Sequence, residues 1–429
     1  MPRVALVCDW LTMVGGAESV LLSLHEMYPD APIYTSKYDK KGIDWFDDAD
    51  VRTGFLQHFP NGLRRFLGPL RQYYFSHLDL SDYDLVISVT GAEAKAVKTW
   101  KGKTNTKKYQ VLRGAQTDRT KYDKTEQPEQ TEHRCVHLCY CHVPTQYYWG
   151  MYDDYLKNPG FGILNPLARL GLRLFVGPLR KKDYASAQNP DQFVTISAYA
   201  ADQIKKYYKR ESIIIYPPAD LKKFSTREAK FSTIEENKNA KKQVKITTNY
   251  ITTSRQVNWK RLDLCVKACL KTGDNLTLIG GGPEHENLVR LANESLSKKS
   301  GDSNSPAQIK FLPTMSQCNV AKHLSEADAF LFPSMEPFGL APIEAMAAGL
   351  PVLAYDKGGS RDYIIDGKNG LFFESQTVSS LVDAMERFKK SQLSTKNNLL
   401  TKEIKKSVKR FDKSIFKQKI KDLVNEKCL

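Results

Sequence analysis

The sequence predicts an α/β fold with parallel sheets, and two stretches carry that prediction. Residues 329–360 contain an apolar run at 329–333, a loop, a helix-forming run at 343–348 and a second apolar run at 352–355. Another apolar run, at 4–8, is followed by two glycines and an amphipathic pattern at about 17–27. A strand, a loop, a helix and a further strand in this order are typical of βαβ units, in which the strands lie parallel.

The helix between the two apolar runs has recognisable ends. Pro342 suits the first turn of a helix, and Gly349 suits its C-terminal end. Gly358 and Gly359 form a turn after the second run. We therefore expect a helix over residues 343–348, with Glu344 in its first turn.

The same reasoning places further elements along the chain. Strands are expected at residues 33–35, 84–89, 133–142, 193–197, 213–216, 250–254, 276–279, 309–312 and 371–373, and helices at 164–176, at 198–208 and from 402 onward. Residues 101–108 and 221–245 are lysine-rich and poor in apolar residues, so we expect an exposed loop and a linker or insertion there.

Length and composition bound the class of protein. A chain of 429 residues predicts two or three domains, and no apolar run approaches the length of a membrane span. The N-terminus enters a strand at once, so we expect no signal peptide, and cysteines scattered among apolar neighbours suggest a reducing compartment. The net charge of +16 favours phosphorylated ligands and an anionic membrane surface. No nucleic-acid-binding motif accompanies it, so we expect no nucleic-acid partner.

Residues 336–360 combine features of a nucleotide-sugar site. Backbone N–H groups at a helix start and a glycine turn suit phosphates, whereas carboxylates accept hydrogen bonds from hydroxyl groups. Glu336 and Glu344 supply two such carboxylates. Taken alone, Glu344 is better explained as a first-turn residue that complements the helix dipole. The combination nevertheless predicts a site for a sugar attached to phosphate.

The segment EPFGLAPIEAMAAGLPV resembles a signature of retaining glycosyltransferases of family 4, in which seven residues separate two glutamates, here Glu336 and Glu344. The resemblance implies the GT-B fold, an α/β architecture of two Rossmann-like domains with parallel sheets facing a cleft. It implies an acceptor-binding domain at residues 1–218, a linker at 219–245, a nucleotide-sugar-binding domain at 246–400 and a C-terminal helix at 401–429 that crosses back to the first domain.

Three other segments resemble the same family: GGAE after the first strand, SRQVNWKR at the start of the second domain, and CHVPTQYYWG after a strand. By this resemblance, Arg255 and Lys260 neutralise the diphosphate, so that no metal or other cofactor is required. The implied role of His142 is to reach the donor hexose or the reacting hydroxyl, and Gly15 and Gly16 lie beside the donor phosphates or the acceptor.

The resemblance assigns the remaining site residues. Glu336 holds sugar hydroxyls and Glu344 the ribose, while the donor also contacts Gly281 and the backbone N–H groups of Phe338, Gly339 and Leu340. The acceptor side comprises Asp9, Trp10 and Tyr148. Retention implies front-face attack with the leaving phosphate as base.

The expected reaction is hexosyl transfer from a nucleotide diphosphate sugar to a lipid-linked or glycan acceptor in cell-surface polysaccharide synthesis. The loop after His142 resembles bacterial mannosyltransferases of O-antigen and capsule assembly, which favours GDP-mannose. UDP-hexoses and UDP-N-acetylhexosamines remain alternatives, as do a non-catalytic nucleotide-sugar-binding protein and a glycogen-synthase-like or phosphorylase enzyme. The expected location is cytoplasmic, peripherally on the inner face of the plasma membrane.

Two kinds of segment allow a second interpretation. In HRCVHLCYCH, residues 133–142, six potential metal ligands occur within ten positions, but on a strand Cys135, His137, Cys139 and Cys141 form a row rather than a tetrahedron. We therefore expect no metal site. Residues 55–75 and 164–176 mix apolar residues with arginines, which fits either a membrane-interface surface or ordinary helices with solvated arginines.

Overall fold

The computed structural model describes residues 2–60, 67–100, 135–157, 159, 162, 165–224, 247–297, 307–395 and 397–428. The chain divides into two compact units. Unit 1 comprises residues 1–195, 203–213 and 421–429, and unit 2 comprises residues 196–202 and 214–420. The exposed loop expected at residues 101–108 and residues 225–245 of the expected linker lie outside the described residues.

Unit 1 is built on a seven-stranded sheet in the order β3-β2-β1-β4-β5-β6-β7. Its strands are β1 (Val4–Cys8), β2 (Ile33–Thr35), β3 (Val51–Thr53), β4 (Leu85–Thr90), β5 (Val136–Cys141), β6 (Gln192–Thr195) and β7 (Ser212–Ile214). The pairings from β3 through to β6 are all parallel. Every residue of β1 and β4 is buried, as expected for strands covered on both faces.

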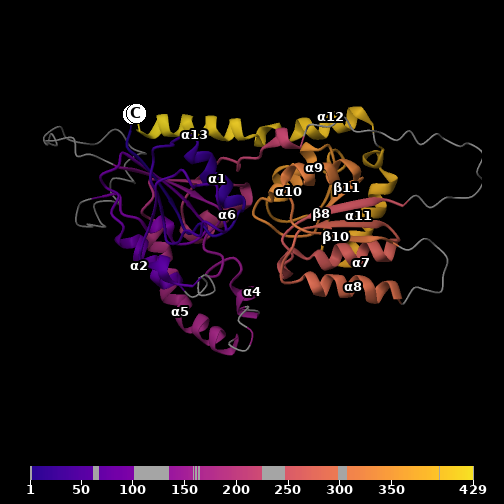
Figure 1. Ribbon diagram of the computed structural model, residues 1–429, viewed down its shortest axis with the longest axis horizontal. Helices are drawn as coiled ribbons and strands as arrows, with labels where there is room; N and C mark the ends of the chain where they lie inside the picture. The colour runs from indigo at the N-terminus through magenta and orange to yellow at the C-terminus, as the bar shows by residue number, and fades with distance from the viewer. Residues whose placement is uncertain are drawn as a thin grey trace, which may run out of the picture. The chain divides into compact units, whose positions relative to one another are not determined.

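Helices cover this sheet in unit 1, as Figure 1 shows. The helices of this unit are α1 (Gly16–His25), α2 (Gly68–His77), α4 (Tyr152–Lys157), α5 (Asn165–Ser186), α6 (Ala198–Tyr208) and the C-terminal α13 (Lys413–Cys428), and α4 contacts α5. The unit boundaries divide α6 and α13, because residues 198–202 and 413–420 group with unit 2. Residues 421–429 thus belong to unit 1, although they follow unit 2 in the chain.

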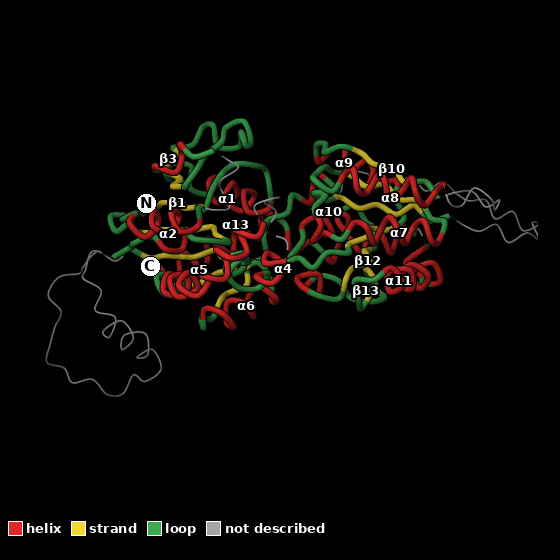
Figure 2. Tube along the Cα trace, turned by 90° about the horizontal axis from the view of Figure 1, so that it is seen from below, coloured by secondary structure: helices red, strands yellow, loops and turns green. Residues whose placement is uncertain are grey.

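Unit 2 is built on a six-stranded sheet in the order β10-β9-β8-β11-β12-β13, with every pairing parallel. Its strands are β8 (Asn249–Thr253), β9 (Asn275–Ile279), β10 (Ile309–Leu312), β11 (Ala329–Phe332), β12 (Val352–Tyr355) and β13 (Gly370–Phe373). Its helices are α7 (Leu262–Thr272), α8 (His285–Ser297), α9 (Gln317–Glu326), α10 (Leu340–Ala347), α11 (Val378–Lys390) and α12 (Asn398–Ser407). Figure 2 shows these helices in red around the yellow strands.

Local chemistry explains where the helices of unit 2 end. Gly273 terminates α7 with φ of 79°, a left-handed conformation that glycine adopts without strain. Gly349 has φ of 93° just after α10, so the predicted stop at this glycine is confirmed. The start of α10 was placed too late by the sequence, because the helix begins at Leu340 rather than at 343.

The core of unit 2 lies between the sheet and helices α7 and α11 and includes two buried cysteines, Cys265 and Cys269. All eight cysteine thiols of the chain are free, and Cys318 is the exposed one. Within the described residues, no helix combines the length and the apolar character that a bilayer crossing demands.

Candidate functional site

In each sheet the strand order reverses between two neighbouring strands, which are β1 and β4 in unit 1 and β8 and β11 in unit 2. Loops that leave the carboxyl ends of such a pair diverge, and parallel α/β folds bind ligands in the space that this opens. Asp9 follows β1, whereas Arg255 and Glu336 follow β8 and β11. The topology therefore brings predicted site residues to the reversal point of each sheet.

At the reversal point of unit 2, Lys260 forms an ion pair with Glu336. The two side chains are 13% and 17% exposed, so solvent reaches the pair but does not surround it. Ser334 donates a hydrogen bond of 2.8 Å to the same carboxylate oxygen of Glu336, and the ammonium of Lys260 lies 4.3 Å from the ring centroid of Trp259. These contacts hold the ammonium in one place at the carboxyl end of the sheet.

The backbone beside Lys260 adopts an uncommon conformation. Lys260 ends a 3-10 turn, Asn258–Lys260, and Arg261 has φ of 53°, one of two non-glycine residues with positive φ in the described chain. A non-glycine residue in this conformation costs about 1 kcal/mol or more, and strained residues of this kind cluster at functional sites. The left-handed residue separates the 3-10 turn from α7, so Lys260 lies before that helix rather than in it.

Arg255 lies exposed in the loop that follows β8. The next residue, Gln256, is fully buried and joins this loop to the glycine turn after β9, because its side-chain amide donates to the carbonyl of Gly280 at 2.7 Å. A Cβ added at Gly280 would lie 2.1 Å from a backbone oxygen, and one at Gly282 would lie 2.4 Å from another. Only glycine fits at these two positions, whereas a Cβ at Gly281 would meet its nearest neighbour at 4.0 Å.

The loop that carries Glu336 is braced by the glycine turn after β12. The backbone N–H of Gly359 donates to the carbonyl of Glu336 at 2.8 Å. A Cβ at Gly358 would come within 2.4 Å of the same carbonyl oxygen, and one at Gly359 within 2.2 Å of the oxygen of Pro337. The two loops therefore touch backbone to backbone, which requires glycine.

Two buried aromatic residues, Phe338 and Tyr363, fix the backbone at the start of α10. Gly339 is the N-cap with φ of 87°, and no side chain caps the helix. Phe338 is 3% exposed, and its carbonyl accepts a hydrogen bond of 3.0 Å from the hydroxyl of buried Tyr363. The first N–H groups of a helix have no partner within it, so the start of α10 at Leu340 offers donors to an anionic or hydroxylated ligand.

Glu344 is the fifth residue of α10, and the first turn of that helix holds no acidic residue. The interpretation of Glu344 as a first-turn partner of the helix dipole is therefore wrong, because the dipole effect fades beyond the first turn. Burial raises the pKa of Glu344 to about 7, although the charge of Lys223 acts in the opposite direction. A carboxyl group with this pKa changes its charge near neutral pH.

In unit 1, His142 directly follows β5, and its backbone N–H donates to the carbonyl of Thr90 at 2.9 Å. Its Nε2 atom is buried and has no hydrogen-bond partner among the described residues. Burial lowers the pKa of His142 to about 4, so the imidazole is neutral near pH 7. A neutral imidazole with an unused ring nitrogen can exchange a hydrogen bond with a ligand hydroxyl.

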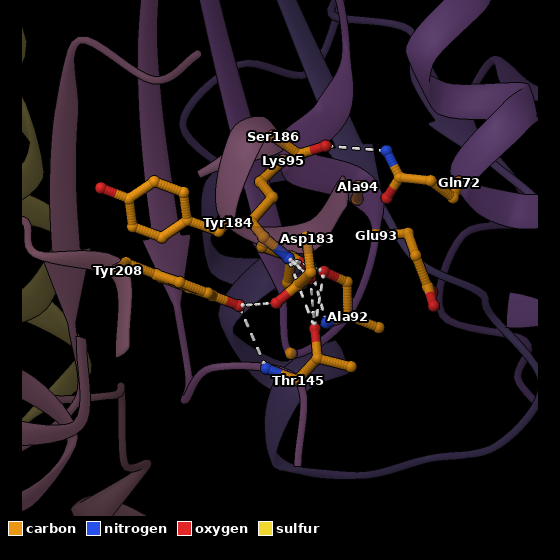
Figure 3. Close-up of polar contacts among 12 residues, drawn as sticks. Gln72, Ala92, Glu93, Ala94, Lys95, Thr145, Asp183, Tyr184, Ser186 and Tyr208 are labelled. Atoms are coloured by element: carbon orange, nitrogen blue, oxygen red, sulfur yellow. Dashed lines mark hydrogen bonds and ion pairs between the residues drawn. The ribbon is translucent and has the colours of Figure 1, made fainter. Parts of the chain in front are cut away.

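The loop after His142 is held by a buried ion pair that the sequence did not reveal. Lys95 and Asp183 meet at 2.6 Å, and each side chain is 1% exposed. Asp183 also accepts hydrogen bonds from Thr145 at 2.8 Å, Tyr208 at 2.8 Å and Trp149 at 2.7 Å. Figure 3 shows the ammonium of Lys95 and the hydroxyls of Thr145 and Tyr208 converging on this carboxylate.

The charges of this pair are well compensated. Burial by itself lowers the pKa of Lys95, but the carboxylate of Asp183 outweighs it and raises that pKa well above the ordinary value. Lys95 additionally donates to the carbonyl of Ala92. The ion pair thus ties together the loop after β4, the loop after β5 and helix α5.

A second buried pair lies close by in the chain. Arg71 and Glu93 meet at 2.9 Å with side-chain exposures of 4% and 0%, and Tyr147 donates to the other oxygen of Glu93 at 2.5 Å. The guanidinium of Arg71 lies 4.9 Å from the ring centroid of Trp10. Both Trp10 and Arg71 line a small pocket, and Tyr148 is buried beside Tyr147.

The carboxylate of Asp9 is hydrogen-bonded to the loop at the end of β4. It accepts hydrogen bonds from the hydroxyl of Thr90 and from the backbone N–H groups of Gly91, Ala92 and Ala94, all between 2.8 and 3.1 Å. These bonds shape the loop that carries Glu93 and Lys95. Gly15 is the N-cap of α1 and Gly16 its first residue, and a Cβ at Gly15 would meet the carboxylate of Glu18 at 2.7 Å.

The cysteine- and histidine-rich segment forms β5, as predicted, and its alternate side chains point into the core. His137 is fully buried, burial lowers its pKa to about 4, and its Nε2 lies 2.8 Å from the hydroxyl of Ser88. Cys135, Cys139 and Cys141 are buried in apolar clusters. Within the part of the chain that the structure describes, no three His, Cys, Asp or Glu side chains are grouped as metal ligands.

Comparison with known proteins finds a family resemblance in the second unit. Residues 233–407 match the family model described as glycosyl transferases group 1, and this range lies within unit 2. D-inositol 3-phosphate glycosyltransferase of Mycobacterium leprae is 32% identical over 135 residues, which is 30% of each chain. The corresponding protein of a Nocardioides species is 36% identical over 110 residues, 25% of this chain and 24% of its own. The matches thus span less than a third of these relatives.

Solved structures resemble the whole chain. HepE of Anabaena in complex with UDP has a TM-score of 0.65 at 16% identity, covering 99% of this chain and 100% of that one. Sucrose-phosphate synthase from Thermosynechococcus elongatus has a TM-score of 0.63 at 16% identity, covering 99% of each chain. The GT-B architecture of two Rossmann-like parallel-sheet domains is thereby confirmed.

Proposed function

We propose that the protein is a retaining glycosyltransferase that moves a hexose from a nucleotide diphosphate sugar to an acceptor hydroxyl. The observation that carries the proposal is the pairing of Lys260 with Glu336 at the reversal point of the sheet in unit 2. The pair combines a cation suited to phosphate with a carboxylate suited to sugar hydroxyls. The glycosyl transferases group 1 match over residues 233–407 supports the same reaction class.

The proposed chemistry assigns each residue a step. The bond between the anomeric carbon and the diphosphate breaks, and the departing diphosphate gains negative charge that Lys260 and Arg255 offset. The N–H groups at the start of α10 bind the sugar and phosphate. The acceptor oxygen forms the new bond on the same face, and its proton passes to the leaving phosphate oxygen. His142, neutral near pH 7, positions the hexose or the acceptor hydroxyl.

The donor that we propose first is GDP-mannose, because the loop from His142 to Trp149 is similar to that of bacterial mannosyltransferases. A UDP-hexose is the second candidate, since the structural relative HepE binds UDP and glucose. We propose a lipid-linked saccharide as acceptor and peripheral attachment to an anionic membrane, on the strength of the net charge of +16. We propose no metal requirement, because two cations can neutralise the diphosphate.

A panel of nucleotide sugars tests the reaction and the donor together. We expect slow hydrolysis of one nucleotide sugar, with GDP-mannose turned over at least tenfold faster than UDP-glucose, UDP-galactose or UDP-N-acetylglucosamine. The measurement is release of the nucleoside diphosphate, with and without EDTA. Preference for a UDP-sugar would exclude GDP-mannose as the donor and favour that UDP-sugar instead. Failure to bind any member of the panel would favour a non-catalytic protein.

The acidity of Glu344 leads to a prediction about nucleotide-sugar binding. Ribose hydroxyls donate to the charged carboxylate and so stabilise it, which lowers the pKa of about 7 on binding. Affinity for the nucleotide sugar should therefore rise with pH, by at most about tenfold per unit, and level off above about pH 7. Isothermal titration calorimetry between pH 5.5 and 8 should reveal proton release.

The matched control is Glu344→Gln, which keeps the shape of the side chain but removes its titration. Its affinity should not change across the same pH range. The diphosphate of a nucleotide sugar has no group that titrates near neutral pH, so the ligand contributes no slope of its own. An equally steep pH dependence in this variant would exclude Glu344 as the ribose partner.

A further inference from the structure

Helix α5, Asn165–Ser186, carries an exposed apolar stripe on its first turns. Leu167, Leu170 and Leu174 are 67%, 54% and 62% exposed, and Phe175 beside them is 62% exposed. Their spacing of three and four residues puts the leucines on one side of the helix. Single exposed apolar residues are common on protein surfaces, but a contiguous row of this kind marks a binding surface.

The opposite side of α5 contacts the loop that follows His142. Asp183 holds Thr145 and Trp149, as described above, and Arg180 donates to the carbonyl of Tyr148 at 2.6 Å. Helix α5 therefore holds the loop that begins at His142. In Figure 1 its first turns extend beyond the sheet of unit 1, whereas its last turns lie against it.

The charge around the stripe is basic. Helix α5 contains Arg169, Arg173, Arg180, Lys181 and Lys182, and its one acidic residue, Asp183, is buried against Lys95. Arg173, Lys181 and Lys182 are exposed. The neighbouring helix α4 brings exposed Asp153 and Asp154 together with Lys157, which leaves the surface of the two helices positively charged.

We propose that α5 is a membrane-docking helix that inserts Leu167, Leu170, Leu174 and Phe175 between the headgroups of an anionic bilayer. Apolar side chains bordered by lysine and arginine are the composition of helices that lie in the membrane interface. A second copy of the chain is a poorer occupant, because a symmetric contact would oppose the same basic residues. This inference rests on the proposed function for its purpose, since it brings the loop after His142 toward a lipid-linked acceptor.

The test is sedimentation of the full-length protein with vesicles, which does not depend on catalysis. We expect binding to phosphatidylcholine vesicles that contain about one third phosphatidylglycerol, and weak binding to phosphatidylcholine alone. The double variant Leu170→Glu/Leu174→Glu should bind at least about a hundredfold more weakly, because each leucine contributes roughly tenfold to the partition constant.

A second variant and a matched control separate insertion from general effects. Lys181→Gln/Lys182→Gln should weaken binding by about tenfold or more and reduce its dependence on salt. Leu399→Glu alters a leucine that is 70% exposed on α12 and should leave vesicle binding unchanged. All positions are exposed, so thermal unfolding of each variant should match that of the parent protein.

Three results would overturn the inference. The first is no binding to anionic vesicles, and the second is binding that the leucine variant does not weaken. The third is a dimer in sedimentation velocity that the same variant dissociates, which would assign the stripe to a second copy. Donor hydrolysis in solution is measured separately, so loss of docking with intact hydrolysis would leave the proposed function standing.

Discussion

Replacing Lys260 with alanine is expected to lower kcat/KM for the nucleotide sugar by about a hundredfold to a thousandfold while the fold remains intact. The ammonium is held by Glu336 and Trp259, so it needs no reorganisation when charge develops on the leaving diphosphate. Since this charge is largest in the transition state, kcat should fall more than KM rises. Steady-state kinetics with the preferred donor measure both.

Ligand binding distinguishes a role of Lys260 in binding the diphosphate from a purely structural role. In Lys260→Ala the affinity for a nucleoside diphosphate should fall, whereas that for the nucleoside should not, because only the former carries the charges that Lys260 meets. Lys267→Ala is the control, since Lys267 pairs with Asp263 at 3.3 Å on the surface of the same unit. Unchanged turnover in Lys260→Ala, or an equal loss in Lys267→Ala, would remove Lys260 from the mechanism.

The substitution Lys95→Met is expected to lower the free energy of unfolding by about 3 to 5 kcal/mol. It leaves the carboxylate of Asp183 buried at 1% exposure without its cation. Three neutral hydrogen-bond donors remain on Asp183, and they do not offset a full charge away from water. Urea denaturation followed by tryptophan fluorescence measures the change.

The double variant Lys95→Met/Asp183→Leu should recover a large part of this loss, because it removes both charges. Lys205→Met is the matched control, since its pair with Glu211 has side chains 67% and 81% exposed and should change stability by less than about 1 kcal/mol. A Lys95→Met protein as stable as the parent would contradict the stabilising role of this buried ion pair.

The sequence predicted most of the strands, because most are short apolar runs between turn residues. β1, β2, β10 and β12 begin and end where the pattern placed them. The edge strand β3 was missed, since Val51–Thr53 is short and largely exposed and so lacks an apolar run. The predicted helix at 164–176 proved longer, because Gly177 and Pro178 interrupt the sequence pattern but not helix α5.

The chemistry of the site was only partly visible in the sequence. Glu336 and Lys260 came from motifs, but their direct ion pair joins residues far apart in the chain and follows from the order of β8 and β11 in the sheet. The pairing of Lys95 with Asp183 spans 88 positions and has no local signature. A lysine five residues beyond the end of the buried strand β4 was the available hint, but the sequence does not show that its side chain is buried.

The placement of two Rossmann-like units facing a cleft stays a prediction, as do the roles of Arg255, Gly281 and the acceptor-side residues. Asp9 illustrates why motif position alone does not decide a role. Its carboxylate accepts hydrogen bonds from the backbone N–H groups of Gly91, Ala92 and Ala94, and these bonds shape the loop that carries Glu93.

The distribution of the thiols has a practical consequence for labelling. Six of the eight cysteines are buried and Cys428 is partly covered, whereas Cys318 lies exposed on α9. A maleimide dye should therefore react first at Cys318, without any cysteine having to be removed. The natural chain can therefore carry one fluorophore on unit 2, which allows spectroscopic titrations with candidate donors.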